Sequence, residues 1–415
     1  MLVGRNRITI LYAVLGTLWL FLFQLCRQHT YADPSSFFYN SHRAYETRYT
    51  KHREREADSF LENVNHADEP FNISSLYRDA DTRDRANRLC VGIPSVARAK
   101  QQFLPKTLGS LLEGLDARQR RSLHVIVLLA DDDPTQHPVF GQMWLERLTD
   151  EVLVYNDTSP STLSSKYRKI EPIASKQDKN LVRNDRIHRD YASLIANCRR
   201  TEADYFALVE DDVIAARDWL DKLSRGLEHL KRSEDSANWL YLRLFYSETY
   251  LGWNSEEWPI YLFRSLAFYS MVLVIYFIIV GADLRRWSKF HLNTHRNNLG
   301  HITFWTASFV ILYFLAGRLM VDPYIEGIRE MQNYGCCAQG LVIPTQHLPA
   351  LEESLYTASE DIAGDSLIEK FADKHYLKKY AIVPSVLQHV GIKGSSDDTA
   401  SKKGTWNFSF ERTNS

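Results

Sequence analysis

Three adjacent carboxylates are the densest chemical feature of the sequence. Glu210, Asp211 and Asp212 directly follow the apolar run of residues 205–209, which predicts a buried strand of a parallel sheet. Ligands of open α/β sheets bind beyond the carboxyl ends of such strands. Clustered carboxylates repel one another and therefore suit a hard divalent cation, Mg²⁺ or Mn²⁺, that can bind a diphosphate. A solvated acidic turn is the alternative, and the strand before the triplet favours the cation site.

Two further groups follow predicted strands. Asp131, Asp132 and Asp133 come after the apolar run 123–130 and form a rival metal site. Acidic loops after strands are usually solvated, so we expect Asp131, the nearest to the strand, to be the one that contacts a nucleotide. His389 ends the last predicted strand, two residues before Gly391. A lone histidine is usually structural, but one at a strand end beside glycine can approach a diphosphate or its metal.

Another candidate carboxylate lies at the start of a predicted helix. Asp365 follows Gly364, where acidic side chains commonly cap the helix or interact with its dipole. A sugar transfer that inverts configuration also requires a positioned carboxylate as general base. Glu360 and Asp361 are nearby competitors for that role.

Alternating strands and helices would position these residues. The apolar runs predict strands at residues 89–94, 123–130, 151–155, 205–209, 239–245, 340–343 and 380–383. Helical apolar spacing lies between them, at residues 101–115, 139–148, 183–199, 217–231, 346–356 and 364–375. Strands that are apolar on both faces and alternate with helices predict an α/β domain with a mostly parallel sheet.

Three long apolar segments predict membrane helices. Residues 8–25 carry no charge and follow Arg5 and Arg7. A cleaved signal peptide would have a shorter apolar region that ends in small residues, whereas this run ends in Gln24-Leu25-Cys26-Arg27. We therefore expect a retained signal anchor.

The other two segments, residues 265–282 and 302–317, predict a membrane hairpin. Arg264 and Arg318 flank the pair, where long side chains can reach the interface. The connecting loop 283–301 is basic, which indicates a cytosolic location. We expect a cytosolic N-terminus, a lumenal segment from about residue 27 to 260, and a second lumenal segment from about residue 320.

These segments give five predicted parts: a tip and anchor at 1–26, a lumenal stem at 27–86, a first catalytic part at 87–259, the hairpin at 260–320 and a second catalytic part at 321–415. The stem is charged and reads mainly as a solvated spacer. The second catalytic part is too small for a core of its own, so we expect the two parts to form one domain. N-glycosylation sequons at Asn72, Asn156 and Asn407 all fall in segments assigned to the lumen.

Composition narrows the function classes. The formal net charge is −1, which gives no indication of nucleic-acid binding. The five cysteines are too few and too scattered for a disulfide framework or a zinc site. Adjacent Cys336 and Cys337 are poorly placed to bond to each other, so we expect at least one of them to reach Cys90 or Cys198.

Several motifs in this order resemble a known family. They are VGIPSV at 91–96, FLPKTLGSL at 103–111, VIVLLADDD at 125–133, LVEDDV at 208–213 and VPSVLQHVG at 383–391. They resemble GT-A glycosyltransferases related to the type-four branching N-acetylglucosaminyltransferases. The tandem membrane hairpin and the segment YGCCAQG at 334–340 look more like the Golgi GPI-N-acetylgalactosamine transferases, the post-GPI attachment to proteins factor four family.

The resemblance implies a GT-A-type, Rossmann-like domain interrupted by the hairpin. It implies a UDP-sugar donor, UDP-GalNAc, and Mn²⁺ or Mg²⁺ at the acidic triplet. Asp212 would bind the metal, with Asp211 and His389 as further ligands, and Asp365 would be the general base. The donor-contacting positions would be Pro94, Ser95, Asp131, Arg186, Asp190, Glu210 and Asp211.

The resemblance also implies an acceptor and a location. The sugar would be transferred in β linkage, with inversion, to the first mannose of the GPI glycan on GPI-anchored proteins or GPI glycolipids in the Golgi membrane. One alternative is an N-glycan branching N-acetylglucosaminyltransferase, which needs no site close to the membrane. A non-catalytic membrane scaffold is a second, and intact acidic and histidine motifs argue against it. A small transporter is weaker still, because the spans offer few intramembrane polar groups.

Overall fold

The computed structural model describes residues 2–44, 46–66, 88–99, 101–155, 165–170, 179–282, 292–331, 335, 338–391 and 406–412. The chain divides into two compact units. We call Met1–Glu46 with Glu248–Tyr324 the helical unit, and Thr47–Ser247 with Ile325–Ser415 the sheet unit. The sheet unit is therefore built from segments on both sides of the apolar pair.

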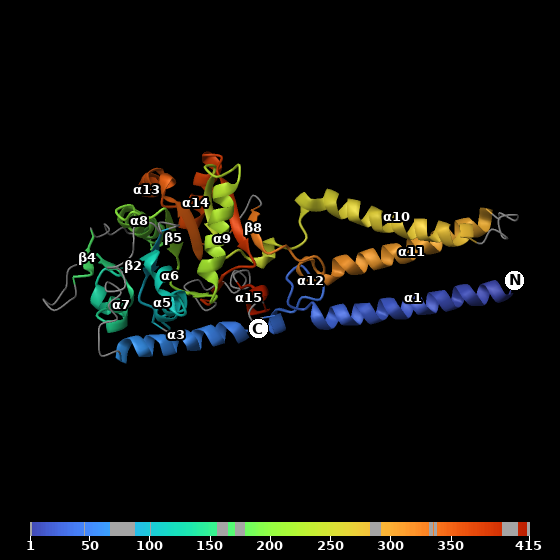
Figure 1. Ribbon diagram of the computed structural model, residues 1–415, viewed down its shortest axis with the longest axis horizontal. Helices are drawn as coiled ribbons and strands as arrows, with labels where there is room; N and C mark the ends of the chain where they lie inside the picture. The colour runs from blue at the N-terminus through green and yellow to red at the C-terminus, as the bar shows by residue number, and fades with distance from the viewer. Residues whose placement is uncertain are drawn as a thin grey trace. The chain divides into compact units, whose positions relative to one another are not determined.

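A mixed sheet forms the centre of the sheet unit (Figure 1). Among the described residues its strand order is β4-β3-β2-β1-β5-β9-β7-β10-β8. The strands are β1 Leu89–Ser95, β2 Leu123–Leu129, β3 Glu151–Val154, β4 Tyr167–Lys169, β5 Tyr205–Val209, β7 Trp239–Arg243, β8 Gly327–Glu330, β9 Gly340–Pro344 and β10 Lys378–Val383. A separate antiparallel pair joins β6 Val213–Ala215 to β11 Leu387–His389.

The strand directions differ partly from the expected parallel arrangement. Strands β1 to β5 are parallel to one another where they pair, and so are β7 and β10. Strand β9 is antiparallel to both β5 and β7, and β8 is antiparallel to β10. The apolar pattern of β9 shows burial on both faces but carries no information on direction, and β8 has the short polar sequence of an exposed edge.

Helices cover both faces of this sheet. On one face lie α5 Leu104–Leu112, α7 Met143–Leu148 and α9 Trp219–Arg232, whose leucines join the largest apolar core. On the other face lie α8 Lys179–Cys198, α13 Leu348–Thr357 and α14 Gly364–Lys374. Helix α6, Ala117–Arg121, precedes β2 and begins with a capping box at Asp116 and Gln119.

Part of the predicted stem is a structural element of the sheet unit. Helix α3, Arg48–His66, packs along α5, and Ala57 lies against Gly109 so closely that a Cβ there would stand 2.9 Å from it. Arg53 is fully buried and donates to the carbonyls of Ala215 at 3.0 Å and Ser110 at 2.9 Å. The prediction of a solvated spacer is therefore wrong for residues 48–66. The many charged residues of this segment gave no indication that an arginine and an apolar stripe are buried.

The short helix α15, Phe408–Arg412, fastens the other end of the chain to the same helix. Glu411 accepts hydrogen bonds from the backbone N–H groups of Tyr49 at 2.8 Å and Thr50 at 3.1 Å. These are the first-turn donors of α3, which otherwise have no intrahelical partner. Phe410 packs beside them with Tyr49, so the two ends of the sheet unit close on each other.

Three long helices dominate the helical unit (Figure 1). Helices α1 Leu2–His29, α10 Trp258–Ala282 and α11 Leu292–Ala316 contain segments long and apolar enough to cross a membrane. The buried carboxylate of Asp33 accepts from the N–H groups of Leu319 at 2.9 Å and Met320 at 3.2 Å, in α12 Arg318–Val321. Gly317 has φ +93, and a Cβ there would lie 2.4 Å from that carboxylate, so both geometry and space require glycine.

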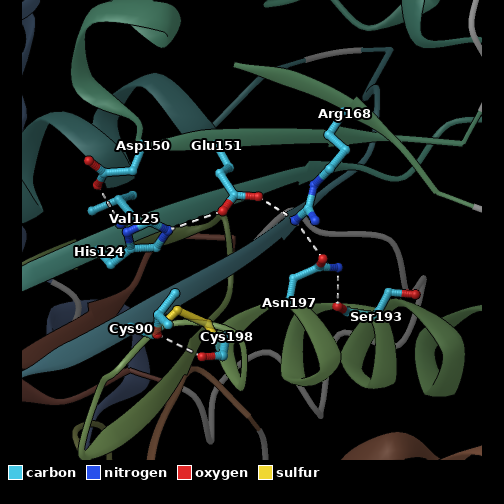
Figure 2. Close-up of a disulfide and its surroundings, with 10 residues drawn as sticks. Cys90, His124, Val125, Asp150, Glu151, Arg168, Ser193, Asn197 and Cys198 are labelled. Atoms are coloured by element: carbon cyan, nitrogen blue, oxygen red, sulfur yellow. Dashed lines mark hydrogen bonds and ion pairs between the residues drawn. A yellow bond between two sulfur atoms is a disulfide. The ribbon is translucent and has the colours of Figure 1, made fainter. Parts of the chain in front are cut away.

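A disulfide links the sheet covalently to α8 (Figure 2). It joins Cys90 of β1 to Cys198 at the end of α8, with 5.7 Å between the Cα atoms. Arg168 of β4 adds a bond of 2.5 Å to Asn197 one residue earlier. The prediction that Cys336 or Cys337 would reach Cys90 or Cys198 is wrong, because Cys90 and Cys198 are bonded to each other. Cys336 and Cys337 lie outside the described residues.

Candidate active site

The acidic triplet lies in the turn between β5 and β6. Ser95 ends β1, and the parallel register of β1 with β5 brings it opposite Asp211, so its Oγ donates to Asp211 Oδ2 at 2.6 Å. Thr107 of α5 is fully buried and donates to the carbonyls of Asp211 at 2.6 Å and Val213 at 2.8 Å. The turn is thus fixed through its backbone as well as its side chains.

Arg98, which the sequence pattern did not single out, is a cation in direct contact with the triplet. Its Nη2 lies 2.7 Å from Asp211 Oδ1 and 3.5 Å from Asp212 Oδ2, and its guanidinium lies 5.1 Å from the centre of the Phe103 ring. Its Nη1 is buried and has no hydrogen-bond partner within the described part of the chain. Burial raises the pKa of Asp211 to about 6, and Arg98 opposes that rise.

Asp212 has one occupied and one unused oxygen. Its Oδ2 lies 3.4 Å from Nε2 of His389. Although burial acts to raise the pKa of Asp212, the contact with His389 and the charge of Arg98 hold it below its usual value. Among the residues that the structure describes, its buried Oδ1 has no hydrogen-bond partner, and neither has Nδ1 of His389. A carboxylate that stays ionised, with an unused buried oxygen beside an imidazole, is prepared to bind a cation.

The second sheet places His389 beside Asp212. His389 of β11 pairs in register with Val213 of β6, and the N–H of Val390 donates to the Asp212 carbonyl at 2.9 Å. A Cβ at Gly391 would stand 2.3 Å from Asp212 Oδ2, closer than any real contact. The glycine therefore lets the backbone approach the carboxylate, as expected at a site that receives a ligand.

His137 is a further buried group that the sequence pattern did not reveal. Its Nε2 lies 3.1 Å from Ser95 Oγ, and its Nδ1 accepts from the N–H of Val139 at 3.3 Å. Burial, with a contribution from Arg98, lowers the pKa of His137 to about 4, so the ring is neutral and its Nε2–H donates to Ser95. Ser95 passes the hydrogen-bond chain on to Asp211. His137 stands in an irregular loop with no motif around it, so no periodicity signalled its role.

Asp365 and Glu210 share one electrostatic environment. Gly364 packs on α8, where a Cβ would stand 2.7 Å from Ile187 and 3.1 Å from Tyr191, so the first turn of α14 lies against that helix. Burial, and then the charges of Asp212 and Asp365, raise the pKa of Glu210 well above its ordinary value. The structure therefore brings Asp365, which begins a helix as expected, to the acidic triplet.

Helix α8 contributes the other predicted contacts. Arg186 donates to Asp132 at 2.6 Å across the loop that follows β2. Asp190 is buried and accepts a hydrogen bond from Tyr155, and burial raises its pKa to about 7. Asp131 accepts from the N–H of Ala97 at 3.0 Å and so fixes the loop after β1.

The remaining candidates are spread more widely. Pro94 lies within β1, paired with Leu128. The backbone carbonyl of Glu360 accepts from Asn184 of α8 at 2.8 Å, and Asp361 accepts from Ser359 on an exposed loop. The charge of Asp365 is one of the causes that raise the pKa of Glu210.

The donor set fits a metal that also binds a ligand. Within the described ranges no group of three His, Cys, Asp or Glu side chains is arranged to hold a metal ion. Asp211 is engaged by Ser95 and Arg98, which leaves Asp212, with His389 beside it, as the protein ligands. Mg²⁺ and similar ions are commonly bound through one or two carboxylates, with water and substrate phosphates completing the shell. Asp212 and His389 fit that pattern.

One predicted glycosylation site is incompatible with the fold. Asn407 is fully buried, and its Nδ2 donates to the Tyr246 carbonyl and to Ser385 Oγ, both at 2.8 Å. A glycan on that nitrogen would displace both bonds, so the prediction is corrected for the folded chain; a sequon pattern does not report burial. Asn72 and Asn156 lie outside the described residues.

Comparison with known proteins adds the family. The family model described as GPI-N-acetylgalactosamine transferase PGAP4 matches residues 89–388. The chain belongs to this family. The match begins at β1, includes the helical insert and ends one residue before His389. Every strand of the main sheet thus falls within it.

Relatives of the PGAP4 family member described here include branching transferases. A segment of 216 residues is 26% identical to the alpha-1,3-mannosyl-glycoprotein 4-beta-N-acetylglucosaminyltransferase C of Macaca fascicularis, over 48% of this chain and 42% of the relative. A segment of 176 residues is 25% identical to the alpha-1,6-mannosyl-glycoprotein 4-beta-N-acetylglucosaminyltransferase of Gallus gallus, over 41% of this chain and 37% of the relative. The matched segments span less than half the length of these relatives.

A solved structure shows a distant likeness. It is the mannosyltransferase PcManGT from Pyrobaculum calidifontis in complex with GDP-Man and Mn²⁺, with a TM-score of 0.23, 14% identity and 46% of each chain covered. A similarity at this level carries no argument about fold or function. Family membership and the two branching relatives are what support a glycosyltransferase.

Proposed function

We propose that this chain is a metal-dependent glycosyltransferase with a GT-A-type catalytic domain. It transfers GalNAc from UDP-GalNAc, in β linkage with inversion, to the first mannose of a GPI-anchor glycan. The observation that carries the proposal is Asp212, whose unused buried oxygen lies beside His389 at the carboxyl edge of the sheet in a member of the PGAP4 family.

The donor is bound at the edge formed by the ends of β1, β2 and β5. Asp212 and His389 hold Mn²⁺ or Mg²⁺, with Asp211 completing the acidic side; the bound ion neutralises the charge of the departing diphosphate. Arg98, whose Nη1 is buried without a partner, can donate to the same diphosphate. Pro94 and Ser95 line the nucleoside pocket.

The other donor contacts come from the helix and loops behind that edge. Arg186 and Asp190 of α8 and Asp131 after β2 hold the nucleotide, and Glu210 contacts the sugar. The raised pKa of Glu210 allows its carboxyl group to stay protonated and donate a hydrogen bond to a sugar hydroxyl.

The acceptor reaction uses a base at the start of α14. In an inverting transfer the acceptor oxygen forms a bond to the anomeric carbon as the bond from that carbon to UDP breaks. The proton of the acceptor hydroxyl goes to Asp365. The backbone N–H of Ser366 donates to Asp365 Oδ1 at 2.7 Å, which holds this carboxylate at the start of the helix.

The location follows from the spans and the disulfide. Three helices suited to crossing a membrane and the basic 283–301 loop support a cytosolic N-terminus and a lumenal sheet unit, in the Golgi membrane. The Cys90–Cys198 disulfide supports an oxidising compartment for the sheet unit. GPI-anchored proteins or GPI glycolipids would be the partners.

A transfer assay with the full chain in lipid-containing micelles tests the proposal. The wild type should transfer GalNAc from UDP-GalNAc to a purified GPI-anchored protein, with the product read by mass spectrometry of the released glycan. EDTA should abolish transfer and Mn²⁺ should restore it. Asp212→Ala should abolish both transfer and UDP-GalNAc hydrolysis, whereas Glu228→Gln on the exposed face of α9 should retain them.

Two outcomes would contradict the proposal. A folded wild type that neither transfers nor hydrolyses any UDP-sugar would indicate a scaffold. Transfer of GlcNAc to an N-glycan acceptor, with none to the GPI glycan, would indicate the branching reaction of the matched relatives.

A further inference from the structure

Two cavities lie in the part of the helical unit that is suited to a membrane. One, of about 330 Å³, is lined by Tyr261, Arg264, Ser265, Phe268, Phe309, Val310 and Tyr313. The second, of about 500 Å³, lies among α1, α10 and α11. Both volumes fall within the range of ligand pockets. Phe268 and Phe309 line both cavities, so the two are adjacent along α10 and α11, and we refer to them together as the groove.

The groove is long enough for a lipid chain. Along α10 it extends from Arg264 to Tyr276, a length of about 18 Å at the helical rise. A hydrocarbon core is about 30 Å thick, so this length corresponds to one leaflet. Apolar side chains line most of it, including Leu15, Val272 and Ile302.

The two ends of the groove differ in chemistry. At one end Arg264, Tyr261 and Tyr313 supply a guanidinium and two hydroxyls. This end is formed by the first turns of α10 and the last turn of α11, where the chain enters from and returns to the sheet unit. The far end holds the hydrogen bonds between Tyr12 and His301 and between Asn298 and Tyr276.

Arg264 is the group at the near end that can donate to an anion. Arg264 is half exposed, and both Arg264 and Arg318 contact the carboxylate of Asp322. Glu257 lies 3.8 Å from the guanidinium of Arg318. Arginine presents five donors in a planar fork that matches phosphate geometry. Arg264 can therefore meet a phosphate at the membrane surface while the rest of the groove takes an apolar chain.

We propose that this groove binds the hydrocarbon chain of the acceptor's own lipid, with the lipid phosphate at Arg264. The inference rests on the proposed function, since it assigns the groove to a GPI acceptor. The direction of the groove carries the assignment: its polar end lies at the ends of α10 and α11 from which the chain continues into the segments of the sheet unit.

Photo-cross-linking of the full chain tests the site without using transfer. The probe is phosphatidylinositol with a diazirine in its acyl chain, incorporated into micelles with the wild type, and labelled peptides are identified by mass spectrometry. We expect labels on groove residues such as Phe268 and Val310. An intact GPI-anchored protein should compete for these labels, and the same protein after phospholipase removal of its lipid should not.

Two tryptophan variants on neighbouring positions of α11 provide a matched pair. Val310 lines the groove, whereas Ile311 is 56% exposed on the outer surface. Val310→Trp should reduce the competed labelling and transfer to the intact acceptor roughly tenfold, the loss expected when about two methylene groups are displaced. Ile311→Trp should change neither. Both variants should hydrolyse UDP-GalNAc as the wild type does.

The outcomes separate this proposal from the proposed function. Labels that intact and delipidated acceptor protein leave equally strong would mean that bulk lipid fills the groove, which overturns the inference. Equal effects of Val310→Trp and Ile311→Trp would overturn it as well. If the wild type transfers no sugar but the intact acceptor still competes for the groove labels, the proposed function fails and the lipid site stands.

Discussion

Each carboxylate of the acidic triplet has its own surroundings. Asp211 is bonded to Ser95 and Arg98, Asp212 faces His389 with one oxygen unused, and Glu210 lies in the electrostatic range of Asp365. Like charges so close together favour protonation of some and ionisation of others. The three side chains therefore support three different roles rather than one shared cage.

Replacement of Arg98 should impair donor binding. Arg98→Ala removes a charged donor from the diphosphate and leaves two carboxylates without their cation, so kcat/KM for UDP-GalNAc should fall by about 10- to 100-fold, as expected for a lost charged hydrogen bond. Arg98→Lys should recover part of the loss because a point charge remains. Steady-state kinetics of hydrolysis measure both. An unchanged kcat/KM in Arg98→Ala would remove Arg98 from the site.

The three candidate bases should separate in a transfer assay. Asp365→Asn should lower transfer to the acceptor by at least about 100-fold, within the range typical of general-base catalysis, while binding of UDP-GalNAc persists. Glu360→Gln and Asp361→Asn, both in the preceding loop, should have far smaller effects. A larger loss in either of the latter would assign the base to that loop.

Asp190 should make stability depend on pH. Its folded pKa of about 7 exceeds the unfolded value of about 4, so the wild type should lose free energy of unfolding as pH rises from about 4 to about 7. Asp190→Asn still accepts from Tyr155 and carries no charge. The variant should therefore match the wild type near pH 4 and exceed it by about 2 to 4 kcal/mol above pH 7. Thermal melts across this range measure the difference, and parallel curves would contradict it.

At the scale of elements, helix α3 has a charged sequence but contributes buried side chains to the core of the sheet unit. Arg53 bridges α5 and the strand that follows the triplet, and its removal takes a charged donor from two carbonyls and leaves Glu113 with Arg217 alone. Arg53→Leu should destabilise the sheet unit by about 3 to 5 kcal/mol, the cost of breaking a buried ion pair from one side. Lys51→Leu, on the exposed face of α3, serves as the control in the same melts. Equal melting temperatures would show that α3 is dispensable.

The close approach at Gly391 gives a second test at this scale. Gly391→Ala places a methyl group against the carboxylate of Asp212 and should reduce Mn²⁺-dependent hydrolysis at least tenfold with little change in melting temperature. Gly300→Ala, where nothing lies within 4 Å, should behave as the wild type. A fully active Gly391→Ala would mean that the backbone moves away freely.

These elements show what the sequence carries and what it omits. Seven strands of the main sheet follow from apolar runs, because burial on both faces leaves a readable pattern, whereas the short strands β4, β6, β8 and β11 do not. The antiparallel direction of β9, the burial of Arg53 and Asn407, and the Arg98 and His137 contacts do not. Each depends on a partner more than 15 residues away in the chain, and a local sequence pattern carries no information about so distant a partner.

At the scale of the whole molecule, the second segment of the helical unit, Glu248–Tyr324, is inserted between β7 and β8. If that insertion serves to keep the site near the membrane, replacement of residues 260–320 by a short linker should abolish transfer to GPI-anchored protein but preserve UDP-GalNAc hydrolysis. A soluble variant that still acts fully on the GPI-anchored protein would show that the hairpin is unnecessary for the acceptor.

The place of β9 between β5 and β7 has a consequence for synthesis. When β7 leaves the ribosome, β5 and β7 lack the strand that will separate them, and about 100 residues, including two spans, are still to be made. At translation rates of 5 to 20 residues per second, this interval is about 5 to 20 seconds. During that time both strands carry unpaired edges prone to association. The nascent chain should therefore depend on chaperones until the α10–α11 pair has been made, and defects in either helix should lead to degradation of the half already made.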